Sequence, residues 1–214
     1  MNKQAQKEFD ILMANYPQLS VCAQDIFASF ELIQETYLQG CIVMICGNGG
    51  SAADAEHMVG ELMKGFKLKR PIIDRQRKRL VDAFPDEGDY LADHLQRALP
   101  TISLVSQSSF LTAAGNDLAP DMVFAQQVFG YGNIGDVLIC ISTSGNAQNV
   151  INACKVAKAN QIRTIGLTGE KGGKLREICD VTICVPANET FRIQEYHLPV
   201  YHALCAMIEA ELYL

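Results

Sequence analysis

The chain has 214 residues, of which 49% are hydrophobic and 20% charged, and its net charge at pH 7 is −6. This length suits one α/β domain with a substantial core, so we expect residues 1–214 to form a single domain. The acidic balance argues against nucleic-acid binding as the main function. No stretch approaches the roughly 18 apolar residues that span a bilayer, so we expect no membrane partner.

The N-terminus has no apolar segment followed by a small-residue cleavage site, which predicts that there is no signal peptide. Most of the eight cysteines sit inside apolar strand-like or helical runs, and no CxxC pair occurs. Free cysteine behaves as a small buried hydrophobe. We therefore expect reduced thiols and a cytoplasmic protein.

Helical and strand patterns alternate along the chain. Residues 3–39 carry apolar residues at helical spacing and predict an N-terminal hairpin of two helices. The continuous apolar run 41–46 predicts a strand buried on both faces of a parallel sheet. Further strands are expected at 101–106, 136–142, 162–167 and 181–185, with helices at 108–115, 120–129, 147–159, 172–178 and 190–212. This order predicts an α/β fold, a three-layer αβα sandwich with a five-stranded parallel sheet.

Residues 67–99 interrupt the alternation between the first core helix and the second strand. They hold a basic run followed by an acidic run, and Leu91, Leu95 and Leu99 are spaced like a short helix. We interpret the segment as a solvated insertion whose helix docks on the domain or on a neighbouring subunit. A lid over the site or a partner-binding arm is the alternative.

Two polar turns follow expected strands, where ligands bind in parallel sheets. The first is Asn48, Gly49, Gly50 and Ser51, with a helix expected from Ala52 and Ser51 as its N-cap. The second is Ser142, Thr143 and Ser144, followed by a helix from Ala147. Either turn alone could be a simple connection. Together, their free N–H groups and hydroxyls predict a site for a phosphorylated ligand.

Titratable residues occur on the helices next to these turns. His57 and Glu61 are four apart and share a helix face, which is typical of a surface pair but also suits a general base or a metal ligand. The last helix carries Gln194, His197 and His202. Its spacing does not decide which histidine is functional.

The chain resembles the sugar isomerase (SIS) family, and within it the sedoheptulose 7-phosphate isomerases. The resemblance rests on CGNGGSAADAEH with Glu61, AAGND, GDVLICISTSGNAQNV, LTGEKGGK and RIQEYHLPVYH, and it covers nearly everything except residues 67–99. It implies aldose–ketose isomerisation of a seven-carbon sugar phosphate through an enediol, in a homotetramer with sites between subunits.

The resemblance also implies roles for individual residues. Glu61 and His202 would act as acid and base, and His57, Glu61, Gln194 and His202 match the positions that hold zinc. The substrate-binding positions would be Asn48, Gly49, Gly50, Ser51, Glu61, Asn116, Asp117, Ser142, Thr143, Ser144 and Gln194. Two residues depart from the family pattern, Ala147 where serine is common and Phe191 where aspartate is common.

Two other functions are compatible with the fold. One is a non-catalytic relative that binds the replication initiator protein, although that branch generally lacks a histidine at the position of His202. The other is a phosphosugar sensor, against which the lack of a preceding helix-turn-helix domain argues.

Overall fold

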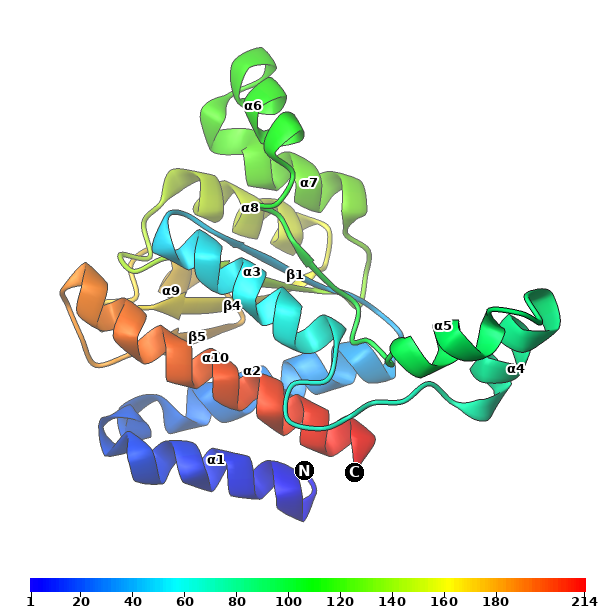
Figure 1. The fold of residues 1–214 in the computed structure, drawn as a ribbon. Helices are drawn as coiled ribbons and strands as arrows, with labels where there is room; N and C mark the ends of the chain where they lie inside the picture. Colours follow the sequence, from blue (N-terminus) through cyan, green and yellow to red (C-terminus); the bar gives the residue numbers. More distant parts are fainter.

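A computed structural model describes residues 1–214 and confirms the three-layer αβα architecture (Figure 1). The five strands form one sheet in the order β2-β1-β3-β4-β5, and all neighbouring pairs are parallel. The strands are β1 (Val43–Gly47), β2 (Thr101–Ser103), β3 (Val137–Ile141), β4 (Arg163–Thr168) and β5 (Val181–Cys184). The predicted strands therefore all form, and most are shorter than their apolar runs.

The strands are buried because alternate residues feed two separate cores. Val43 and Ile45 of β1 face one core, whereas Met44 and Cys46 face the other. This alternation explains why the strand sequences read as continuous apolar runs rather than as every second residue.

Helices cover both faces of the sheet. The first core lies beneath α1 (Lys3–Asn15), α2 (Ala23–Leu38), α3 (Gly50–Met63) and α10 (Thr190–Tyr213). The second lies beneath α6 (Ser108–Asp117), α7 (Val123–Tyr131), α8 (Gln148–Ala159) and α9 (Leu175–Ile178). Short 3₁₀ helices, η1 (Pro17–Cys22) and η2 (Pro120–Met122), precede α2 and α7. None of the helices is both long and apolar enough to cross a membrane.

The insertion forms a helical hairpin that extends from the body of the molecule (Figure 1). Its helices are α4 (Asp74–Ala83) and α5 (Gly88–His94), so the single helix expected around Leu91–Leu99 is wrong in both number and bounds. The basic and acidic runs meet where Arg77 of α4 forms ion pairs with Asp89 and Asp93 of α5. The helix α4 has no buried residue. Within one chain the hairpin packs on itself rather than on the domain.

The sheet order places a switch point at its centre. From β1 the chain runs to β2 on one side and then crosses to β3 on the other. Loops leaving such neighbouring strands separate and leave a crevice at their carboxyl ends. The two polar turns predicted to bind phosphate follow β1 and β3, the strands on either side of this crevice.

Candidate active site

The two polar turns meet in one pocket of about 320 Å³. Its lining includes seven predicted residues from the turns, and Gln194 of α10 joins them: Asn48, Gly49, Gly50, Ser51, Ser142, Thr143, Ser144 and Gln194. Thr190 and the apolar residues Ile141 and Ala147 complete the wall. The pocket thus lies at the start of α3 and close to the starts of α8 and α10, where free N–H groups favour an anion.

Glycine permits close contacts at one point in this pocket and at one point beside it. A Cβ on Gly50 would lie 2.4 Å from Nε2 of Gln194, so glycine lets the α10 side chain lie against the first turn. Gly145 has φ +65°, and a Cβ there would lie 1.9 Å from the carbonyl oxygen of Gly172. A side chain at Gly145 would therefore clash with backbone that has no freedom to rotate away.

The helix starts differ slightly from expectation. The helix α3 begins at Gly50, with Gly49 at the N-cap, so Ser51 lies inside the first turn and makes no capping hydrogen bond. The predicted N-cap role of Ser51 is therefore wrong. A side-chain bridge that the sequence did not reveal, Asn48 to Asn149 of α8, joins the first turn to the second helix through two hydrogen bonds of 2.8 and 2.9 Å.

Farther along α3 and α10, three titratable side chains converge. Nε2 of His57 lies 3.3 Å from Oε1 of Glu61 and 3.4 Å from Nε2 of His202. The rings of His57 and His202 meet edge to face, with centroids 4.9 Å apart. Of the two histidines of α10 that the spacing could not separate, His202 lies beside His57, whereas His197 is fully buried.

Burial lowers the pKa of His202, and the nearby imidazole of His57 lowers it further, while the Glu61 carboxylate opposes both. A lowered pKa keeps the imidazole neutral at physiological pH. His202 is thus prepared to accept a proton or to bind a metal through its free nitrogen.

Two residues position His57, and the sequence patterns did not single out either of them. The Tyr201 hydroxyl donates a hydrogen bond to Oδ1 of Asp54 at 3.2 Å and lies 3.0 Å from Nδ1 of His57. Because that hydroxyl proton goes to Asp54, the oxygen accepts the Nδ1 proton of His57. The lone pair of His57 Nε2 then points toward Glu61 and His202, the arrangement expected of a metal-binding imidazole. The only available signals were that Asp54 is three residues before His57 and that Tyr201 adjoins His202.

The backbone of Glu61 is held in place by the buried ion pair between Arg70 and Glu209. Arg70, fully buried, donates from Nε to Glu209 of α10 at 2.7 Å and from its other nitrogens to the carbonyl oxygens of Glu61 and Leu62. Glu209 also accepts the backbone N–H groups of residues 66, 67 and 68. This network ties the end of α3 to α10. It therefore holds the backbone of Glu61 against the helix that carries His202.

The distances between the side-chain nitrogen and oxygen atoms of His57, Glu61 and His202 can be compared with those between the ligands of a zinc ion. Two ligand atoms at 2.0–2.1 Å from a tetrahedral ion are about 3.3–3.4 Å apart. The His57–Glu61 and His57–His202 distances match this spacing. The ligand atoms of His57, Glu61 and His202 do not all lie within 4.8 Å of one another. Those of Cys140, Cys154 and Cys179 do. Two of the three distances in the His57–Glu61–His202 set thus match a zinc site, and the cysteine group could also hold a metal ion.

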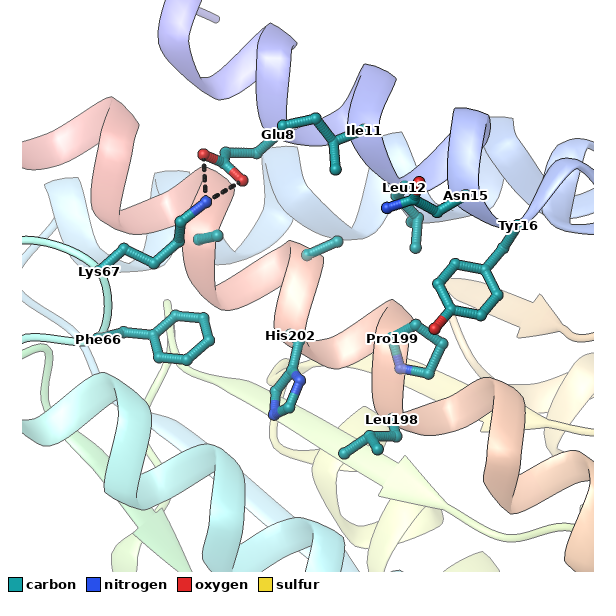
Figure 2. A pocket seen from close by; sticks show the side chains of 12 residues that line it. Glu8, Ile11, Leu12, Asn15, Tyr16, Phe66, Lys67, Leu198, Pro199 and His202 are labelled. Carbon is teal, nitrogen blue, oxygen red and sulfur yellow. Dashed lines mark hydrogen bonds and ion pairs between the residues drawn. The ribbon is translucent and has the colours of Figure 1, made fainter.

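A second hollow, of about 430 Å³, lies on the other side of His202 (Figure 2). It is bounded by α1 and α10, with a Glu8–Lys67 ion pair of 2.6 Å at one end and Tyr16 beside Pro199 at the other. Most of its lining is apolar. These walls suit sugar hydroxyls poorly, so the α3 side of His202 is the better place for a sugar.

Asn116 and Asp117 do not join the site within one chain. They are exposed at the end of α6, which packs against η2 and α7, and they hydrogen-bond to each other at 2.8 Å. Of the two departures from the family pattern, Ala147 lines the turn pocket, whereas Phe191 is 54% exposed and lies under the guanidinium of Arg192.

The structure thus combines a parallel αβα sandwich, a polar pocket at its switch point and a His/Glu cluster farther along the same two helices. Residues 84–169 match the model of the SIS domain. A phosphoheptose isomerase of Aliarcobacter butzleri is 44% identical over 85% of this chain and 82% of its own length.

Solved structures agree with the sequence comparison. A phosphoheptose isomerase of Neisseria gonorrhoeae is 33% identical with a TM-score of 0.71, over 96% of this chain and 91% of that one. One from Francisella tularensis is 28% identical with a TM-score of 0.76, over 93% and 92%. The chain belongs to the phosphoheptose isomerase family and is a sugar-phosphate isomerase.

Proposed function

We propose that this enzyme converts sedoheptulose 7-phosphate to D-glycero-D-manno-heptose 7-phosphate through an enediol. The carrying observation is that the His57–Glu61–His202 cluster and the turn pocket lie along the same two helices. Gln194 in the pocket and His202 in the cluster are eight residues apart on α10, or about 12 Å at 1.5 Å per residue. An extended seven-carbon sugar can bridge this gap with its phosphate in the pocket.

At the phosphate end, the turns supply neutral donors. Hydroxyls of Ser142, Thr143 and Ser144, together with helix-start N–H groups, would hold the dianion. No lysine or arginine lines this pocket. Ala147 offers no hydroxyl, so the helix α8 would contribute to phosphate binding through its backbone alone.

At the reacting end, Glu61 and His202 would transfer the protons. Isomerisation moves a proton between adjacent carbons and requires a second group to move hydroxyl protons. We assign the carbon-bound proton to Glu61 and the hydroxyl proton to His202, whose lowered pKa leaves it neutral and able to accept one. Each correctly placed group contributes about 10²–10⁴-fold.

His57, Glu61 and His202 would hold a zinc ion. The resemblance implies Gln194 as a fourth ligand, but its side chain here lines the turn pocket, so it would have to move toward the cluster to reach the same ion. Such an ion would polarise the substrate carbonyl. Tyr201 and Asp54 would then serve to orient His57 toward it.

We also propose that the working enzyme is a cytoplasmic homotetramer with sites between subunits. The supporting observation is that Asn116 and Asp117 are exposed on α6 and do not line the turn pocket of their own chain. A second copy would bring them to it. The eight free cysteines are consistent with a reducing compartment.

The substrate assignment is tested by comparing sedoheptulose 7-phosphate with D-fructose 6-phosphate, each followed by NMR with purified enzyme and added zinc. The sugar that is one carbon shorter should reach the two ends together less well, so kcat/KM should be about 10-fold or more lower for it. Equal rates on both sugars, or no turnover of the heptulose phosphate, would contradict the proposal.

A further inference from the structure

A second group of metal-ligating side chains lies in the core on the opposite face of the sheet from His57 and His202. Cys140 projects from β3, Cys154 from α8, and Cys179 directly follows α9. Their sulfur atoms all lie within 4.8 Å of one another, and those of Cys154 and Cys179 are 3.5 Å apart. Two sulfurs bound at 2.3 Å to one tetrahedral ion are about 3.8 Å apart. The three thiols therefore already stand near the spacing of a thiolate site.

The sheet makes room for these sulfurs by using glycine beside them. Gly166 of β4 is the register partner of Cys140 in β3. A Cβ on Gly166 would lie 3.4 Å from the sulfur of Cys179, in ordinary van der Waals contact, and closer still to the Thr182 side chain at 3.1 Å. A residue larger than alanine would therefore crowd Thr182 first and then Cys179.

The surroundings favour a thiolate, the form of cysteine that binds metals, at Cys154 alone, since the pKa values of Cys140 and Cys179 are both raised. Hydrogen bonds donated by the thiols of Cys140 and Cys179 lower the pKa of Cys154, and the Thr164 hydroxyl and the Lys158 charge act in the same direction. Lys158 is itself paired with Asp180. Burial opposes this effect.

The cluster has a route to solvent. Cys140 and Cys154 are fully buried, but Cys179 is only partly so and lines a cavity of about 490 Å³. The charged residues that line this cavity are three carboxylates and a single cation: Asp25, Glu170, Asp180 and Arg176. Their net negative charge would attract a cation to the thiols without any opening of the core.

We propose that Cys140, Cys154 and Cys179 form a binding site for a thiophilic metal ion, such as Zn²⁺, Cd²⁺ or Cu⁺. Three sulfur ligands form the soft donor set that selects these ions over Mg²⁺, Ca²⁺ and Mn²⁺. The ion joins β3, α8 and the end of α9, so it stabilises the folded chain. It takes no part in isomerisation, because its ligands lie in the core beneath α8, on the other face of the sheet from the catalytic cluster.

Cadmium is the probe that tests this site, because its bonds to thiolates give an ultraviolet charge-transfer band that histidine and carboxylate ligands do not give. Cd²⁺ is titrated into reduced full-length protein, and the thermal unfolding midpoint is measured in parallel. We expect a band that saturates at one ion per chain, a raised midpoint, and the same band in a His57→Ala variant. In Cys179→Ser the band should fall by about one third or disappear, since one of three ligands is lost.

Cys179→Ser is the informative variant because its side chain is only partly buried and the substitution should not prevent folding. Cys184→Ser is the matched control, since Cys184 is also partly buried and lines the same cavity outside the cluster. The control should keep the whole band. Absence of a band in the wild type, a band unchanged in Cys179→Ser, or a band lost in Cys184→Ser would overturn the proposal.

Discussion

Two histidines on α10, a little over one helical turn apart, meet entirely different surroundings. His202 lies beside His57 and lines a largely apolar hollow. His197 is completely buried, and neither of its ring nitrogens has a hydrogen-bond partner. Five residues rotate a side chain by about 140° around the helix axis, so one histidine faces the α3 site and the other the core. The chemistry of a residue on this helix is thus decided by what packs against its face.

The largest effect expected from this contrast is on stability in acid. Burial lowers the pKa of His197 to about 4, below its ordinary value of 6.5. Between these values the unfolded chain binds a proton that the folded chain does not, so stability falls as pH falls through this window and is intact above it. A shift of this size corresponds to about 3 kcal/mol.

The His197→Leu variant should therefore lose about that much of the pH dependence when the free energy of unfolding is measured by urea titration at pH about 7 and about 4. Its activity at neutral pH should stay near that of the wild type, because His197 lies outside the cluster. A variant that keeps the wild-type slope in acid would show that other groups carry it.

A smaller effect is expected from a substitution of Tyr201, whose hydroxyl contacts Asp54 and His57 of α3. Tyr201→Phe removes the hydroxyl that holds Nδ1 of His57 and leaves the ring in place. Loss of such a positioning hydrogen bond typically costs about 10–100-fold in metal affinity or activity. Zinc affinity and kcat should fall together while the unfolding midpoint changes little.

A merely structural role for Tyr201 would give the reverse pattern, a lower unfolding midpoint with unchanged zinc affinity. Asp54→Asn offers a second check on the same chain of hydrogen bonds. Because an amide oxygen still accepts the Tyr201 proton, this variant should be affected less than Tyr201→Phe.

Much of the fold could be predicted from the sequence because buried parallel strands leave continuous apolar runs, as at 41–46 and 136–142. The turn pocket could also be predicted, since both turns directly follow such strands. The insertion was harder because seven of the ten residues of α4 are polar, and Arg77 pairs with carboxylates of α5 rather than with the domain. Local spacing carries no information about that pairing.

The chemistry that depends on contacts between distant segments could not be predicted from spacing. Tyr201 reaches Asp54 and His57 across the interface of α10 with α3, far apart in the sequence. Cys140, Cys154 and Cys179 come from three elements and form no CxxC motif, so only the folded chain shows them together. The position of Asn116 and Asp117 relative to a site depends on a second copy and stays a prediction.

The central claim is that Glu61 and His202 carry the proton transfers, and the most direct measurement is kcat of single variants on sedoheptulose 7-phosphate. We predict that Glu61→Gln and His202→Ala each lower kcat by about 10²–10⁴-fold, while Glu31→Gln on the exposed face of α2 leaves it unchanged. All three variants should unfold near the wild-type midpoint. Wild-type kcat in either folded active-site variant would contradict the account.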